Sequence, residues 1–264
     1  MDRLLEIAAA VCFGIALAHT ARVFVRGIHQ AAPRNFYLVA LGFVFQTGFL
    51  WLRGERIGRC PITNLFEVLM FVAWSIALIY LVIGPVYRLS LMGAFTAPLV
   101  FFLQMLAFLL APDRPMSARA AVNPGLEFHA SMSLIAYGAF ALACIAGVMY
   151  LVQERQLKRH QLHSLFFHLP PLTSLFAAMT RLLWIGLGLY SIGLVSGFFT
   201  GLPLPRLKML AAFGVWLLYA AILGARHWRS VAPARVAALS VAAFTFALSL
   251  LWSITFVSHP SPAS

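Results

Sequence analysis

Two histidines, His129 and His259, are the residues of this sequence best suited to chemistry. Each lies where an apolar stretch meets a more polar one, and histidine is a common axial ligand of haem iron. If both lie on one face of a membrane, they can hold a non-covalent, b-type haem between them. We therefore predict His129 and His259 as metal ligands that approach closely enough to share one iron.

Two further histidines, His19 and His227, are candidates for a second haem site on the inner face. An imidazole ligates iron well when its other ring nitrogen has a hydrogen-bond partner. A hydrogen bond across a helix bundle is the interpretation we favour for His19. The inner haem site stays open as the alternative.

The elements that must position these histidines are membrane helices. Mean hydropathy is +0.91 and only 10% of residues are charged, which excludes a soluble globular protein. Eight apolar runs approach the roughly 20 residues that cross a bilayer: Leu4–His19, Phe36–Leu52, Leu65–Ile83, Leu89–Leu110, Phe128–Val152, Leu182–Thr200, Met209–Gly224 and Val236–Val257. Runs this continuous span as helices, so the sequence predicts an all-α, polytopic membrane protein with a single domain over residues 1–264.

The distribution of basic residues predicts the topology, because they favour cytoplasmic loops. With both termini outside, eleven fall in inner loops and eight in outer segments. The inner set is Arg22, Arg26, Arg34, Arg88, Arg155, Lys158, Arg159, Arg181, Arg226, Arg229 and Arg235, and the outer set is Arg3, Arg53, Arg56, Arg59, Arg114, Arg119, Arg206 and Lys208. We predict a multi-pass protein of the inner (plasma) membrane. Leu4–Ala18 resembles a signal peptide, but Asp2 offsets Arg3, so we expect this segment to be retained.

The net charge of +12 is explained by this topology and by contact with anionic lipid, and no nucleic-acid-binding motif accompanies it. The three cysteines are far apart in sequence, without the spacing for covalent haem attachment or thiol–disulfide exchange. We expect Cys12 and Cys144 to be core residues, whereas Cys60 lies in an outer loop without an evident partner.

Three other segments carry local signals. Asn64 followed by Glu67 predicts a helix cap that opens the third span. The long loop Gln153–Arg181 contains His160, His163 and His168, which lack companion ligands at metal spacing and are interpreted as surface residues. Its apolar part, Leu165–Met179, is predicted to be an amphipathic helix on the inner membrane surface.

The segment Pro61–Trp74, PITNLFEVLMFVAW, resembles the corresponding stretch of the cytochrome c assembly family, whose members include the CcsA, CcmC and HemX groups. Phe128–Tyr137, FHASMSLIAY, is similar to a helix start of the same family. Trp184–Gly197 and the pair of Lys208 and Trp216 are weaker matches. The resemblance covers roughly Cys60 to His259.

The resemblance implies that His129 and His259 flank an outer haem site. The chain departs from the family pattern between Gly197 and Lys208, where its sequence FFTGLPLPRL stands in place of a tryptophan-rich haem-presenting segment. A transmembrane histidine expected near the end of the seventh span is Gly224 here. The chain therefore resembles the shorter HemX-like branch.

The leading function that the resemblance implies is a haem-handling protein of cytochrome c maturation, which binds haem and presents it at the outer face. We expect no bond chemistry from this chain alone, so other maturation proteins would be its partners. The alternative is a HemX-like regulator whose basic inner loops bind a tetrapyrrole-synthesis enzyme. A transporter of another amphiphile is a third possibility.

Overall fold

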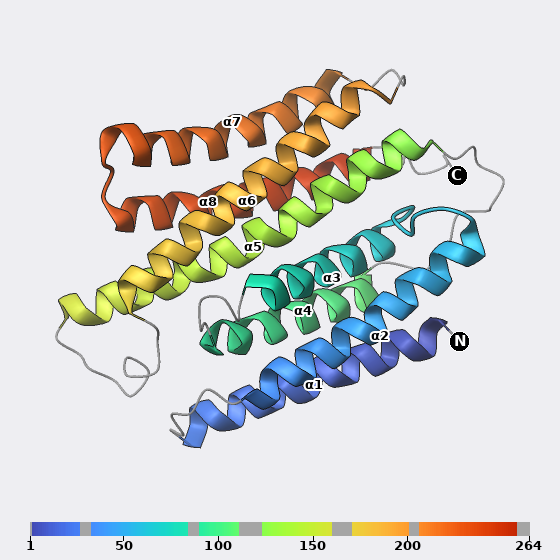
Figure 1. The fold of residues 1–264 in the computed structure, drawn as a ribbon, viewed down its shortest axis with the longest axis horizontal. Helices are drawn as coiled ribbons and strands as arrows, with labels where there is room; N and C mark the ends of the chain where they lie inside the picture. Colours follow the sequence, from blue (N-terminus) through green and yellow to red (C-terminus); the bar gives the residue numbers. More distant parts are fainter. Residues whose placement is uncertain are drawn as a thin grey trace.

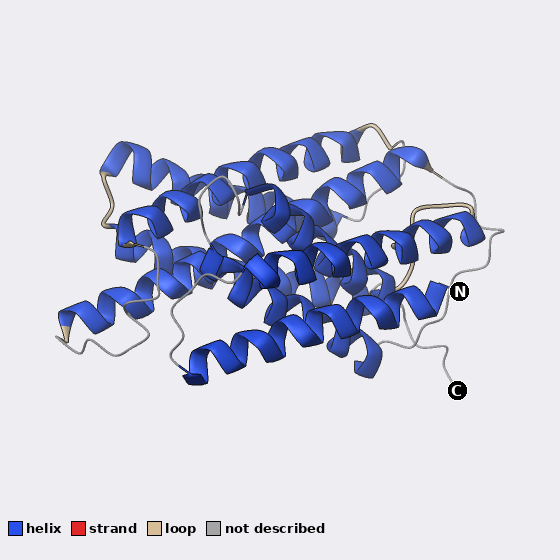
Figure 2. Ribbon diagram, turned by 60° about the horizontal axis from the view of Figure 1, so that its bottom comes forward, coloured by secondary structure: helices blue, strands red, loops and turns tan. Residues whose placement is uncertain are grey.

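The computed structural model describes residues 2–26, 33–83, 90–110, 123–159, 171–200 and 206–257. Within these ranges the chain forms eight α-helices and no strand (Figure 2), which confirms the all-α prediction. The helices are α1 (Asp2–Arg26), α2 (Pro33–Ile57), α3 (Leu65–Ile83), α4 (Ser90–Leu110), α5 (Pro124–Lys158), α6 (Leu172–Phe198), α7 (Arg206–Arg229) and α8 (Pro233–Val257). Seven described helices are long and apolar enough to cross a membrane, and Phe95–Leu109 of α4 forms a shorter apolar helix.

Successive helices run in opposite directions, so α1 begins at the end of the molecule where α8 ends (Figure 1). We call this the outer end, after the predicted topology, and the opposite one the inner end. Helices α1 to α4 form one group and α5 to α8 another (Figure 1). The main contact between the groups is that of α3 with α5.

The contact between α3 and α5 depends on a glycine. A Cβ atom added to Gly138 of α5 would lie 2.9 Å from Cβ of Ser75 and 3.0 Å from the backbone nitrogen of Ile76. These distances leave no room for any side chain at position 138. Small residues allow membrane helices to approach closely, since van der Waals packing is what holds such helices together.

Helices α5 and α6 share the largest interface of the molecule. Phe140 of α5 fills the space where a side chain of Gly186 would lie. On its other side the Phe140 ring stacks on Tyr219 of α7, with ring centroids 3.7 Å apart. One buried ring thereby joins three helices of the second group.

Six of the observed helices begin before their predicted apolar runs, and α1, α2, α5 and α7 also continue past them, because polar residues continue a helix and helix caps, rather than hydropathy, set its ends. Helix α3 coincides with its predicted run, and α4 begins one residue later than predicted. The prediction of a surface helix over Leu165–Met179 is wrong from residue 172 onward. These residues form the first turns of α6, and Leu175, Ala178 and Met179 are buried in the core. Residues 160–170, including His160, His163 and His168, lie outside the described residues.

Candidate functional site

His129 lies in the second turn of α5, at the outer end. The helix begins at Pro124, which suits the first helical position, and Asn123 caps it by accepting a hydrogen bond from the backbone nitrogen of Leu126 at 3.1 Å. The amide nitrogen of Asn123 also donates to the carbonyl oxygen of Thr200 at 3.1 Å. The start of α5, and His129 with it, is thereby tied to the end of α6.

The imidazole of His129 has one hydrogen-bond partner that determines its tautomer. Its Nδ1 lies 2.6 Å from the carbonyl oxygen of Gly193 on α6. A carbonyl oxygen only accepts, so Nδ1 must carry the proton and donate it. In the neutral ring the lone pair then resides on Nε2, which is the arrangement that second-shell carbonyls impose on metal-binding histidines.

Two glycines of α6 make room for side chains at the start of α5, and Gly197 is the one beside the His129 ring. A Cβ atom added to Gly197 would lie 2.9 Å from Nδ1 and 3.1 Å from Cε1 of His129. One added to Gly193 would lie 2.7 Å from Oγ of Ser133. The segment Trp184–Gly197 carries a weak family resemblance. It also carries a signal for close helix packing that the sequence analysis did not use, namely the spacing of four between Gly193 and Gly197.

Exposed aromatic residues occur at the outer ends of both helices. Phe128 precedes His129, and Phe198 and Phe199 follow Gly197 directly; all three are exposed. Phe198 and Phe199 are the first two residues of the FFTGLPLPRL segment, and Phe128 directly precedes the predicted ligand. Exposed aromatic residues of this kind suit contact with lipid or with a flat apolar ligand.

The second predicted ligand, His259, lies outside the described residues. Helix α8 ends at Val257, and this end of the molecule is the one where α5 begins. The prediction that His129 and His259 share one iron therefore stays a prediction. In the described part of the chain no group of three or more His, Cys, Asp or Glu side chains could hold a metal ion.

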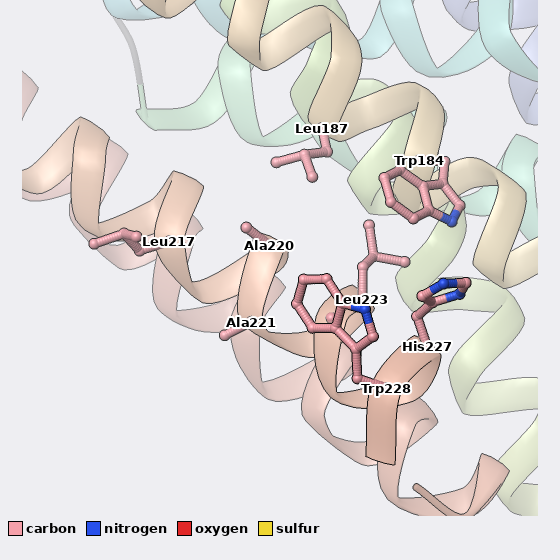
Figure 3. Close-up of a pocket in the computed structure, with 9 residues that line it drawn as sticks. Trp184, Leu187, Leu217, Ala220, Ala221, Leu223, His227 and Trp228 are labelled. Carbon is pink, nitrogen blue, oxygen red and sulfur yellow. The ribbon is translucent and has the colours of Figure 1, made fainter. Parts of the chain in front are cut away.

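The structure does not bring His19 and His227 together. His19 is on α1 and His227 on α7, and Figure 1 shows these helices on opposite sides of the molecule with α5 and α6 between them. The hydrogen bond favoured for His19 is not observed with any residue that the structure describes. His227 is exposed and, with Trp184 and Trp228, lines a cavity between α6 and α7 (Figure 3).

A buried ionic cluster joins α1, α2 and α3 at the outer end. The Nε atom of Arg53 donates to Oε1 of Glu67 at 3.0 Å, and its Nη1 atom lies 3.4 Å from Oδ2 of Asp2. Arg56 donates both of its terminal nitrogens to Asp2, at 2.9 and 3.0 Å. Arg53, Asp2 and Glu67 are at most 3% exposed. The local cap pattern at Glu67 did not reveal its ion pair with Arg53, which is distant in the sequence.

The predicted cap is nevertheless confirmed. Asn64 accepts from the backbone nitrogen of Glu67 at 2.9 Å, and the Glu67 carboxylate accepts from the nitrogen and hydroxyl of Thr63 at 2.8 and 2.7 Å. Trp74, the last residue of the Pro61–Trp74 segment, donates from Nε1 to Oγ1 of Thr47 on α2 at 2.8 Å. This segment therefore acts as the joint between α2 and α3.

The loop before α3 also contacts the start of α5. The backbone nitrogen of Cys60 donates to Oε2 of Glu127 at 3.2 Å, and its Sγ atom lies 3.5 Å from Oγ of Ser131. Cys60 thus has a partner that its sequence position did not reveal. Burial raises the pKa of the Cys60 thiol, and the carboxylates of Glu127 and Glu67 raise it further, although the contact with Ser131 lowers it.

The two weaker motif matches meet in the structure. Nε1 of Trp216 on α7 donates to Oγ of Ser191 on α6 at 2.8 Å, and the hydroxyl of Tyr190 donates to the carbonyl oxygen of Ala212 at 3.3 Å. The hydroxyl of Tyr137, in the Phe128–Tyr137 segment, donates to the carbonyl oxygen of Ala247 on α8 at 3.3 Å. The residues that carry the resemblance are therefore mostly contacts between helices.

Comparison with known proteins confirms the family resemblance seen in the sequence. A family model described as cytochrome C assembly protein matches residues 62–259. Among the relatives, Protein HemX of Brevibacillus brevis is 27% identical over 180 residues, which cover 67% of this chain and 66% of that protein. Protein HemX of Bacillus subtilis (strain 168) is 27% identical over 74% of both chains. Cytochrome c biogenesis protein CcsA of Guillardia theta is 27% identical over 81% of this chain and 80% of its own length. This chain, a multi-pass helical membrane protein by its own structure, belongs to the cytochrome c assembly family.

Proposed function

We propose that this protein binds a non-covalent, b-type haem at its outer end and presents it at the outer face of the cell's inner membrane for cytochrome c maturation. Nε2 of His129 and the imidazole of His259 would hold the haem iron. The observation that carries the proposal is the hydrogen bond from Nδ1 of His129 to the carbonyl oxygen of Gly193. Histidines that bind metal typically donate their second ring nitrogen to such a group.

The residues around His129 suit a haem in two further respects. Its ring is held between α5 and α6 by Gly193 and Gly197, so little conformational entropy is lost when Nε2 binds iron. The exposed rings of Phe128, Phe198 and Phe199 offer apolar surface to the macrocycle. Haem supplies the iron that these ligands coordinate, and the chain contributes binding and orientation; partner maturation proteins would receive the group.

The test is the visible spectrum of the full chain, purified in mild detergent and titrated with haem. Wild type should develop the absorbance bands of a six-coordinate haem with two histidine ligands. His129→Ala should lose or shift them, and added imidazole should restore them by filling the vacant coordination position. His19→Ala and His227→Ala are the controls and should leave the bands unchanged. Bands that persist in His129→Ala but vanish in His227→Ala would contradict the outer site.

A second candidate function is a membrane regulator that binds a tetrapyrrole-synthesis enzyme through its basic inner end. The observation that favours it is the length of α5: 35 residues rise about 52 Å, far more than the roughly 30 Å hydrocarbon core. Its last turn carries Arg155 and Lys158, with Arg159 as the following cap residue. Neutralising these three residues should weaken capture of such an enzyme without changing the haem spectrum, whereas an unchanged capture would contradict this role.

A further inference from the structure

A cavity of about 550 Å³ lies between α6 and α7, in their inner halves. Figure 3 shows Trp184 of α6 and His227 and Trp228 of α7 gathered around it, with Leu187, Leu217 and Leu223 as its apolar walls. The side chains of Trp184, Leu217 and Trp228 are about half exposed or more, at 55, 49 and 83%. The cavity is therefore a groove that opens at the surface of the helix bundle.

Two side-chain hydrogen bonds join the two helices in their outer halves. The bonds of Trp216 to Ser191 and of Tyr190 to Ala212 hold α6 against α7 there, and the helices diverge toward the inner end (Figure 1). Small residues of α7, Ala220, Ala221 and Gly224, leave its floor open. At Gly224 an added Cβ would lie 3.1 Å from the Trp228 ring, so the glycine allows the indole to lie across the helix.

Two exposed arginines lie close in sequence to residues that line this groove. Arg181 comes one turn before Trp184 on α6, and Arg229 follows Trp228 directly; both arginines are exposed, as is His227. Residues 172–257, which form α6, α7 and α8, contain no aspartate or glutamate. The local charge therefore complements an anion, and the groove below it complements a hydrocarbon chain.

We propose that this groove binds one anionic phospholipid. An acyl chain lies between Trp184 and Trp228 along the floor of Ala221 and Gly224, and the headgroup phosphate contacts Arg181 and Arg229. Basic pockets between membrane helices bind anionic headgroups in this manner, and tryptophan prefers the level of the headgroups. The proposal is independent of the haem site, which lies at the opposite end of α6.

The experiment measures quenching of tryptophan fluorescence by phospholipids brominated on the acyl chain, with the full chain in mild detergent. Brominated phosphatidylglycerol, which is anionic, should quench at lower concentration than brominated phosphatidylcholine. The double variant Arg181→Gln/Arg229→Gln should weaken the phosphatidylglycerol effect roughly thirtyfold, since two basic contacts are lost. Lys208→Gln, at the outer end of α7, is the matched charge control and should behave as wild type.

Three further variants distinguish binding in the groove from binding elsewhere on the surface. Trp228→Leu should remove most of the phosphatidylglycerol-dependent quenching, whereas Trp51→Leu, which removes an exposed tryptophan of α2, should preserve it. Ala221→Phe fills the groove without changing its charge and should weaken binding even where the arginine variants fold poorly.

Four results would overturn the proposal. One is equal quenching by the two lipids, and another is an unchanged response in the arginine double variant or in Ala221→Phe. The third is displacement of the lipid by haem together with a Soret band that His227→Ala abolishes, which would make the groove a haem site. Inorganic phosphate at millimolar concentration should leave the quenching unchanged, and complete displacement by it, the fourth result, would assign the two arginines to free phosphate instead.

Discussion

At the scale of single residues, the orientation of His129 depends on residues of another helix. The carbonyl oxygen of Gly193 holds its Nδ1 proton, and Gly197 leaves the volume that the ring occupies. Neither glycine has a side chain that would contact a ligand. Their contribution is to hold the imidazole with Nε2 as the basic nitrogen.

We predict that Gly197→Ala lowers the affinity for haem by about tenfold or more, because loss of a second-shell contact commonly costs 10- to 100-fold. The added methyl group would lie 2.9 Å from Nδ1 and force the ring to move. Gly188→Ala is the matched control on the same helix, since nothing lies within 4 Å of a Cβ atom there. Haem titrations followed by absorbance check this, and an unchanged affinity in Gly197→Ala would contradict the positioning role.

The same substitution has a readout that does not require haem. ¹⁵N chemical shifts of the His129 ring report which nitrogen carries the proton. We expect a protonated Nδ1 in wild type and a mixture of tautomers in Gly197→Ala. If wild type shows the proton on Nε2, the geometry proposed for the ligand is wrong even where haem binds.

At the scale of elements, the Pro61–Trp74 segment joins helices. Asn64 caps α3, Glu67 pairs with Arg53 of α2, and Trp74 bonds to Thr47 of the same helix. Asp2 extends the cluster to α1. Because Arg53 is 2% exposed, its charge needs the compensation that these carboxylates provide.

Arg53→Met should therefore destabilise the protein by about 3–5 kcal/mol, the usual cost of leaving one partner of a buried ion pair uncompensated. Adding Glu67→Gln to it should recover part of this loss, since the buried charge is then removed. Arg155→Met, at an exposed position of α5, is the control and should change stability little. Thermal unfolding in detergent measures the stability of all three variants. If Arg53→Met unfolds at the same midpoint temperature as wild type, the cluster contributes nothing to stability.

At the scale of the whole molecule, the alternating helices place the starts of α1, α3, α5 and α7 at one end. His129 and the ionic cluster lie at this end, and the α6–α7 groove lies toward the other. The distribution of basic residues predicts that the first end lies outside. The proposed presentation of haem depends on this orientation.

A membrane-impermeant maleimide tests the orientation in intact cells. In a background with Cys12, Cys60 and Cys144 replaced by alanine, Glu55→Cys should be labelled directly. Ala232→Cys, in the turn between α7 and α8, should be labelled only after the membrane is permeabilised. Both positions are exposed. The reverse pattern would rule out presentation at the outer face and leave the family membership untouched.

The helices of this molecule and their alternating directions could be predicted from the sequence alone, for a physical reason. A bilayer requires long apolar helices with internally satisfied backbones, so hydropathy predicted the helices and their alternation. The cap at Asn64 and the core position of Cys12 were predictable because they depend on neighbours within a few residues or on burial alone.

Tertiary structure decided the contacts that give individual residues their roles. The hydrogen-bond partner of His129, Gly193, is 64 residues away in the sequence, and Cys60 contacts Ser131, which is 71 residues away. The separation of His19 from His227 follows from which helices pack together, as does the groove where α6 and α7 diverge. Hydropathy is nearly uniform along these spans, so it does not specify which faces of which helices meet. The close fits at Gly138 and Gly197 do specify which helix faces meet, since van der Waals packing between helices discriminates one arrangement from another within a bilayer.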